Sequence, residues 1–173
     1  MLRKNWLWIS LILVLLLLNM AYMIFRLQDE SYTTYRKSSH KPLPVMNKKI
    51  IHTDQAPAPI GPYSQAVLLD STLYISGQVA INPATQQVEA TTVAEEAHQV
   101  MKNLEAVLRA AGLGFGDVAK TTIFLTDMND FPVVNEIYGS YFSGDFPARE
   151  TVQVSALPKN VHVEISMIAG NSK

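Results

Sequence analysis

The stretch TVAEEAHQVMKNLEAVLRAAG, residues 92–112, carries the clearest structural signal in the chain. Its apolar residues recur every three or four positions, which is the spacing of one face of a helix. Thr92 followed by Glu95 has the pattern of a capping box, and Gly112 stands where a helix commonly ends in a left-handed residue. The stretch predicts an amphipathic helix over residues 92–111 whose apolar face covers another layer.

Runs rich in β-branched and aromatic residues lie on both sides of this helix and predict strands. Pro132 in the first turn after Asn129 or Asp130 indicates a second helix with an apolar stripe. The expected strands are residues 48–53, 66–70, 72–79, 118–127, 149–156 and 161–170. Six strands and two amphipathic helices predict an α+β fold, with both helices on one face of a sheet.

The first 47 residues differ in character from the rest. Residues 6–25 contain no charged residue and would span about 30 Å as a helix, the thickness of a bilayer core. We therefore expect a basic tail over 1–5, a transmembrane helix over 6–25, a linker over 26–47 and a globular domain over 48–173. A cleaved signal peptide fits less well, because the apolar run is long and is followed by a poor cleavage site. Flanking Lys and Arg residues are nearly balanced, so a single-pass membrane location leaves the side of the domain open.

Composition excludes several classes of function. The chain has no Cys, which removes disulfides, Cys-based zinc sites and thiol nucleophiles. Residues 48–173 hold eight Lys and Arg against thirteen Asp and Glu, a net charge of −5. Nucleic acid binding needs clustered basic residues, so we expect no nucleic acid partner. His52, His98 and His162 lack metal-ligand spacing, and no metal site is expected.

Two charged residues stand on expected strands where they could do chemistry. Alternation along its strand places Arg149 on a polar row, opposite Val152 and Val154. Glu164 lies between the apolar Val163 and Ile165. A turn at 157–160 should join the two strands as a hairpin and so bring Arg149 near Glu164. The pair is either a solvent-exposed salt bridge, or an Arg that binds a substrate carboxylate beside a Glu that orients water.

Three further positions are weaker candidates. Tyr63 follows Gly-Pro in a loop stiffened by prolines, where packing is the commoner role. Gly77 interrupts a strand pattern, which suggests a bulge or a close backbone approach. Asn135 lies on the second helix and has the ordinary explanation of a surface polar residue. None of the three defines a function alone.

Several motifs together resemble one known family, the RidA (YjgF-type) reactive intermediate deaminases. The motifs are APAPIGPYSQAV at 56–67, LYISGQVAINPATQQV at 73–88, the stretch 103–138, and FPARETVQVSALPKNVHVEISMIA at 146–169. The resemblance covers about residues 49–170. It implies a chorismate-mutase-like α+β fold with a mixed six-stranded sheet, assembled as a homotrimer with sites between subunits. It also implies hydrolysis of 2-imino and 2-enamino acids, such as 2-aminoacrylate, to 2-keto acids and ammonia, without metal or cofactor.

The resemblance assigns a role to each candidate residue. Arg149 would hold the substrate carboxylate and Glu164 would position or activate water. The substrate-binding residues would be Tyr63, Ser76, Gly77, Asn135 and Thr151. Two neighbours of Arg149 depart from the family pattern, because Thr151 stands where Cys is common and Glu150 where a small residue is usual.

These two departures keep a second hypothesis open. A module of the same fold could bind small carboxylic acids or a protein partner without turnover. Alternation puts Glu150 on the opposite face of its strand from Arg149, so its charge should point away from the substrate. A nuclease role is disfavoured by the acidic domain.

Overall fold

A computed structural model describes the backbone of residues 2–39 and 45–170, and the side chains of residues 13–31 and 45–170. The chain divides into two compact units, Met1–Val45 and Met46–Lys173. This boundary lies close to the predicted start of the globular domain at Lys48.

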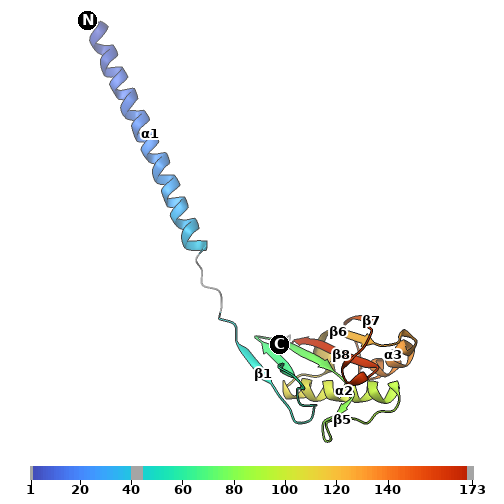
Figure 1. The fold of residues 1–173 in the computed structure, drawn as a ribbon. Helices are drawn as coiled ribbons and strands as arrows, with labels where there is room; N and C mark the ends of the chain where they lie inside the picture. Colours follow the sequence, from blue (N-terminus) through green and yellow to red (C-terminus); the bar gives the residue numbers. More distant parts are fainter. Residues whose placement is uncertain (1, 40–44, 171–173) are drawn as a thin grey trace. The chain divides into compact units, whose positions relative to one another are not determined.

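The first unit contains one long helix, α1 (Leu2–Ser39) (Figure 1). The helix continues through residues that we expected to form a linker, because 26–39 contain neither Gly nor Pro to end it. The rest of that linker includes residues 40–44, which lie outside the described part. Within the residues searched, no helix combines the length and apolarity needed to cross a bilayer. The predicted span begins at residue 6, and the side chains of 6–12 lie outside the described residues.

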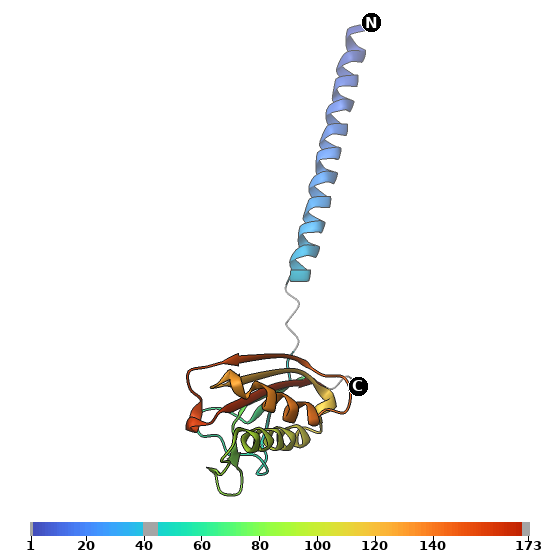
Figure 2. The ribbon, with the colours of Figure 1, turned by 90° about the vertical axis from the view of Figure 1, so that its right-hand side faces the viewer.

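The second unit is built on a six-stranded sheet. In spatial order its strands are β1 (Lys48–Ile51), β2 (Ala66–Leu69), β3 (Thr72–Gln78), β8 (Val163–Gly170), β6 (Val118–Leu125) and β7 (Ala148–Gln153). Only β6 and β7 pair in parallel, so the sheet is mixed. The helices α2 (Val93–Ala110) and α3 (Phe131–Ser140) pack on one face (Figures 1 and 2). The predicted α+β architecture is confirmed.

Short elements connect the main ones. The loop expected after residue 79 contains a small hairpin of β4 (Ile81–Asn82) and β5 (Gln87–Val88). Three single 3₁₀ turns follow: η1 (Phe115–Asp117), η2 (Met128–Asp130) and η3 (Pro158–Asn160). The turn predicted at 157–160 is therefore present as η3.

The strand pairing around Arg149 differs from the prediction. The strands β7 and β8 do not form a hairpin, because β6 lies between them and pairs with both. The helix α3 connects β6 to β7 as a crossover, which makes those two strands parallel neighbours. The residues after Gln153 leave the sheet before η3 and return as β8. Adjacency in sequence was therefore a wrong guide to adjacency in the sheet.

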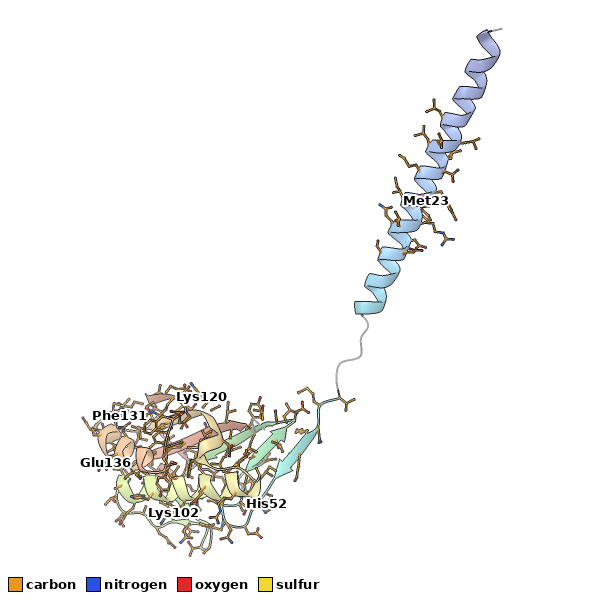
Figure 3. The ribbon with its side chains drawn as sticks, turned by 180° about the vertical axis from the view of Figure 1, so that it is seen from behind. Met23, His52, Lys102, Lys120, Phe131 and Glu136 are labelled. Carbon is orange, nitrogen blue, oxygen red and sulfur yellow. The ribbon has the colours of Figure 1, made fainter. Side chains whose placement is uncertain are left out.

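Side-chain alternation gives the sheet two different faces. On β8, Val163, Ile165, Met167 and Ala169 are buried toward α2 and α3. The opposite side, here called the open face, bears Tyr74, Val152 and Ile168, which are 46%, 42% and 36% exposed. Lys120 lies on this side of the domain, whereas Lys102 projects from α2 on the other side (Figure 3). The uncovered apolar side chains leave this face available for contact with another surface.

The ends of α2 match the sequence prediction. Thr92 Oγ1 accepts a hydrogen bond from the Glu95 amide at 3.2 Å, and the Glu95 carboxylate accepts from the Thr92 amide at 3.2 Å. Gly112 has φ of +77°, the left-handed conformation expected after a helix. On α3, Tyr138 is 2% exposed and packs in the core.

A buried carboxylate on α2 holds the beginning of β8. Glu96 is 4% exposed, and its Oε2 accepts a hydrogen bond from the His162 amide at 2.6 Å. Its Oε1 lies 2.8 Å from His162 Nδ1. This hydrogen bond and the charge of Glu96, with a smaller contribution from Asp130, raise the pKa of His162. The imidazolium form is thereby favoured in the folded protein.

The raised pKa of His162 predicts a pH-dependent stability. The contribution is fully present below the unfolded pKa of about 6.5 and is lost as pH rises through the higher folded pKa. Because the His162 side chain is 57% exposed, we expect about 1 kcal/mol or less. Urea unfolding of the wild type and His162→Asn between pH 5 and 9 measures it. The two free energies of unfolding should converge as pH rises, and a constant difference would contradict the prediction.

Candidate active site

Four of the predicted site residues meet in one cleft. Tyr63, Ser76, Gly77 and Glu164 line a cavity of about 240 Å³ between β3, β8 and the loop before β2. Its remaining walls come from residues not singled out from the sequence, namely Ile60, Val79 and Pro158. All three are apolar and lie outside the β-strands and α-helices of the structure. The cleft thus combines one carboxyl group with a largely apolar wall.

Gly77 makes room for the Glu164 carboxyl group. A Cβ atom at residue 77 would lie 1.8 Å from Glu164 Oε1 and 2.7 Å from its Cδ. The pairing of β3 with β8 shifts register between Ile75 and Gln78, so Gly77 lies in a bulge. The close approach suggested by a glycine inside a strand pattern is confirmed. The carboxyl group occupies the space that any other side chain at this position would fill.

Glu164 supplies the carboxyl group of this cleft. Burial raises the pKa of its carboxyl group above the usual range. Among residues 45–170, no group donates a hydrogen bond to this carboxyl. Its oxygens are therefore open to a water molecule or a ligand. A carboxyl with a raised pKa and free oxygens is suited to exchanging a proton with a bound molecule.

The loop that carries Tyr63 is organised by a buried amide. Gln65 is 2% exposed, and its Nε2 donates to the carbonyl oxygens of Thr53, Ala56 and Pro57 at 3.0, 3.2 and 2.8 Å. Its Oε1 accepts from the Thr53 amide at 2.7 Å. Tyr63 itself is 46% exposed, and its hydroxyl accepts from the Ile60 amide at 3.2 Å. Gln65 was missed from the sequence, where one Gln in a loop carries no signal.

Ser76 is held by the same loop. Its Oγ donates to the Ser64 carbonyl at 2.7 Å, and its amide donates to the Gln65 carbonyl at 3.0 Å. These two hydrogen bonds tie β3 to the segment bearing Tyr63. Ser76 thus fixes the wall of the cleft, and its hydroxyl proton is already engaged.

Arg149 lies in a second cavity, of about 320 Å³, with Asn135, Tyr138, Gly139 and Phe146. Its guanidinium carbon is 4.9 Å from the centroid of the Tyr138 ring and 5.7 Å from that of Phe131. Stacking on aromatic faces orients an Arg while leaving its edge N–H groups free. No carboxylate among residues 45–170 forms an ion pair with Arg149. The guanidinium is available to bind an anion.

Arg149 and Val152 lie on opposite faces of β7, as alternation predicts, but the packed face is not the one that we expected. Arg149 faces α3, while Val152 points to the open face. The guanidinium lies against the Tyr138 and Phe131 rings of α3, and the faces of aromatic rings attract a cation. Tyr138 is fixed beneath it by a hydrogen bond from its hydroxyl to Thr121 Oγ1 at 3.2 Å. Burial raises the pKa of Tyr138 and keeps the phenol neutral.

The neighbours of Arg149 separate as alternation predicts. Glu150 lies on the opposite face of β7 and forms an ion pair with Lys120 and a hydrogen bond from Thr122 Oγ1 at 2.5 Å. The charge of Glu150 is therefore paired with Lys120 on the open face, away from the Arg149 cavity. Thr151 shares the face of Arg149, and its Oγ1 is buried without a hydrogen-bond partner among the described residues. A buried hydroxyl left free is a candidate to bind a ligand.

One copy of the chain does not bring the two charged residues together. Arg149 and Glu164 line different cavities, on strands separated by β6 and on opposite faces of the sheet. The expected proximity of the two within the sheet is wrong. The candidate residues form a carboxyl half with Glu164, Tyr63, Ser76 and Gly77, and a guanidinium half with Arg149 and Asn135. Thr151 lies on the same face of β7 as Arg149 but lines neither cavity.

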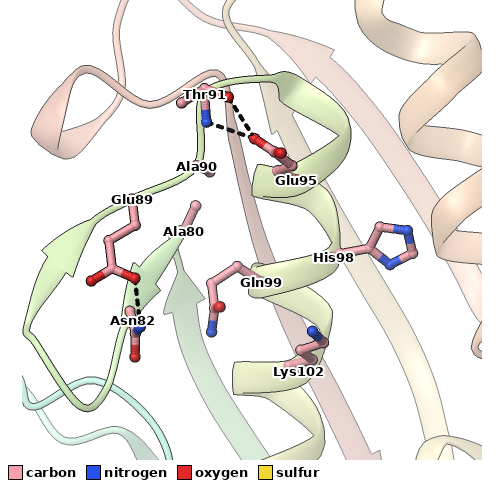
Figure 4. Close-up of a pocket in the computed structure, with 9 residues that line it drawn as sticks. All are labelled: Ala80, Asn82, Glu89, Ala90, Thr91, Glu95, His98, Gln99 and Lys102. Atoms are coloured by element: carbon pink, nitrogen blue, oxygen red, sulfur yellow. Dashed lines mark hydrogen bonds between the residues drawn. The ribbon is translucent and has the colours of Figure 1, made fainter.

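A wider cavity of about 550 Å³ lies between the β4–β5 hairpin and α2 (Figure 4). It contains none of the candidate residues. Its carboxylates are already bonded, because Glu89 accepts from Asn82 at 2.7 Å and Glu95 from Thr91 at 2.8 Å. These bonds close the hairpin and cap the helix, which is a structural role. Among the described residues, no group of three or more acidic, His or Cys side chains could hold a metal ion.

Comparison with known proteins defines the class of this domain. The sequence profile of the endoribonuclease L-PSP family matches residues 53–171. The chain belongs to this family, which includes the RidA and YjgF proteins. The resemblance stated from the motifs is thereby confirmed.

Individual relatives are close in sequence and in structure. The mouse protein named 2-iminobutanoate/2-iminopropanoate deaminase is 56% identical over 122 residues, which are 70% of this chain and 90% of the mouse protein. The YjgF gene product of E. coli is 46% identical with a TM-score of 0.69, covering 71% of this chain and 98% of that one. E. coli TdcF, solved with bound serine, is 44% identical with a TM-score of 0.69, covering 72% and 99%.

Proposed function

We propose that this protein hydrolyses 2-imino acids, and their 2-enamino tautomers, to 2-keto acids and ammonia. The observation that carries the proposal is a free guanidinium on an aromatic platform together with an unbonded carboxyl of raised pKa. The guanidinium of Arg149 can bind a substrate carboxylate, and the carboxyl group of Glu164 can accept or donate a proton. The name of the mouse relative, 56% identical, supports the same chemistry.

The reaction needs little from the protein beyond positioning. Arg149 binds the carboxylate of the substrate through paired N–H groups. Glu164 orients a water molecule against the imine carbon and accepts its proton as the C–O bond forms. The resulting carbinolamine expels ammonia after the nitrogen is protonated, and the 2-keto acid remains. An enamine substrate must first take a proton at carbon, a step for which a carboxyl with raised pKa is suited.

The test is an assay of imine loss. An amino acid oxidase generates 2-iminobutanoate in the presence of semicarbazide, which traps the imine that survives. The wild-type chain should lower semicarbazone formation and release ammonia at an increased rate. Binding of 2-ketobutanoate without faster imine loss would favour the alternative, a non-catalytic carboxylate-binding module. RNA binding is not expected, because the net charge of residues 48–173 is −5.

The complete site is proposed to form between copies of the chain in a homotrimer. Two observations support this arrangement. The guanidinium half and the carboxyl half lie in separate cavities of one copy. The open face also exposes the apolar side chains Tyr74, Val152 and Ile168, which a second copy would cover. Each site would then take Arg149 from one subunit and Glu164 from its neighbour.

Complementation between two inactive variants tests this arrangement. Arg149→Ala and Glu164→Gln chains, each nearly inactive alone at low substrate concentration, are unfolded together in equal amounts, refolded, and assayed at that concentration. If each site uses two subunits, every mixed trimer contains one intact site. Three quarters of randomly assembled trimers are mixed, so about a quarter of wild-type activity should return. A mixture that stays inactive, although native mass spectrometry shows mixed trimers, would place both residues in one subunit.

The long apolar stretch is proposed to tether the domain to a membrane. The support is the absence of charge over residues 6–25 within the continuous helix α1. The full chain should remain with membranes after extraction at alkaline pH. The charged variant carries Leu13→Glu and Leu16→Glu, and a charged side chain costs about 2.5–3.5 kcal/mol at the centre of a membrane helix. That variant should be released, and release of the wild type would overturn the tether.

A further inference from the structure

The contact between α2 and the first residues of β8 involves a buried charge. Glu96 is the only charged residue among the buried polar residues of the described part of the chain. Its Oε2 accepts from the His162 amide at 2.6 Å and from the Val163 amide at 3.3 Å. One carboxylate oxygen therefore binds two successive amides at the point where β8 begins.

The backbone of His162 is also held by Thr126, the residue that follows β6. The Thr126 amide donates to the His162 carbonyl at 3.1 Å. His162 thus has its amide fixed by α2 and its carbonyl fixed by the end of β6. Because charge-assisted hydrogen bonds are stronger than neutral ones, the Glu96 contacts define this part of the backbone more strongly than a ladder bond alone.

Glu164 follows directly after these anchored residues. No hydrogen bond from residues 45–170 holds its carboxyl, so the backbone and the space above Gly77 determine where it lies. Phe124 of β6 is its partner in the register. That space is narrow, because Glu164 Oε1 lies 1.8 Å from the position that a Cβ of residue 77 would occupy. A small shift of the backbone at 162–163 would move the carboxyl out of this position.

We propose that Glu96 is a positioning residue for Glu164. It acts through the His162 and Val163 amides and does not itself touch the substrate. The inference rests on the proposed deaminase function, in which Glu164 must direct a water molecule onto the imine carbon. Misplacement of a catalytic group by about 1 Å can lower a rate by about 10²-fold. The substrate carboxylate is held by Arg149, on a different strand, so substrate binding should be spared.

The test compares Glu96→Ala, Glu96→Gln and Val107→Ala in the full chain. We expect Glu96→Ala to lower kcat by about tenfold or more, with KM within about twofold of the wild type. Glu96→Gln should recover part of kcat, because its amide oxygen can still accept from one backbone amide. Val107→Ala removes buried volume from the same helix and should keep kcat per folded molecule. An unchanged kcat in Glu96→Ala, or an equal loss in Val107→Ala, would overturn the proposal.

A structural measurement separates this inference from the proposed function. Crystal structures of the wild type and Glu96→Gln, or Glu96→Ala where it folds, give the position of the Glu164 carboxyl. Displacement of that carboxyl from its place above Gly77 supports the positioning role, even where no turnover is found in any variant. An undisplaced carboxyl in both variants contradicts it. Absence of wild-type turnover alone overturns the proposed reaction, and the structures still decide the role of Glu96.

Discussion

Arg149→Ala should lower kcat/KM for 2-iminobutanoate by about 10²-fold to 10³-fold, the effect of truncating one partner of a charge-assisted hydrogen-bonded pair. The loss should fall mainly on KM, because the guanidinium holds a carboxylate that does not change during the reaction. Imine hydrolysis at several substrate concentrations separates the two constants. The rate of imine loss measured with semicarbazide but without protein sets the lower limit of detection.

Variants at and near this position test the reason for the effect. Arg149→Lys should recover little, because an ammonium group cannot form the paired contacts of a guanidinium or stack on Tyr138 in the same way. Tyr138→Phe keeps the ring and should keep most of the activity, whereas Tyr138→Leu should raise KM. Lys102→Ala, which removes a cation far from the Arg149 cavity, is the matched control. An equal loss in Lys102→Ala would mean that overall charge, and not the Arg149 site, attracts the substrate.

Local elements of the fold could be predicted because their signals are local. The capping box at Thr92 and Glu95 and the left-handed Gly112 depend on residues close in sequence. The bulge at Gly77 forms against the distant strand β8, but a glycine inside a strand pattern marked its position. The order of strands depends on distant contacts. The turn at 157–160 suggested a hairpin, but β6 and α3 place β7 two strands away from β8. The periodicity of apolar residues predicts that a segment is a strand, but it does not predict which strands are its neighbours in the sheet.

The site shows the same division between local and distant information. Arg149 and Glu164 were selected from the sequence as candidate residues, and the face of Glu150 opposite Arg149 was predicted from alternation. The aromatic platform was not predicted, because it needs Phe131 and Tyr138 of α3 to pack over β7. Glu96 was not identified from the sequence, where it is one of several charged residues on a predicted helix. In the structure it is buried against β8. Burial of a carboxylate against backbone amides is visible only once the fold is known.

Gly77→Ala should remove most of the activity while leaving the fold intact. A Cβ at residue 77 would lie 1.8 Å from Glu164 Oε1, so one of the two groups must move. The carboxyl is the end of a flexible side chain, and it can rotate away at low cost, whereas the β3 backbone is paired with β8. We expect kcat to fall by about 10²-fold, the effect of misplacing a catalytic group by about 1 Å.

The melting temperature distinguishes this displacement from a general loss of structure. Gly116→Ala is the matched control, because a Cβ there would meet no atom within 4 Å. Both variants should melt within a few degrees of the wild type, since about 1 kcal/mol shifts the midpoint of a domain of this size by only about 4 °C. Gly77→Ala alone should lose kcat. Full activity in Gly77→Ala would show that the carboxyl works from another position, and Glu164 above Gly77 would then not be the arrangement that carries the reaction.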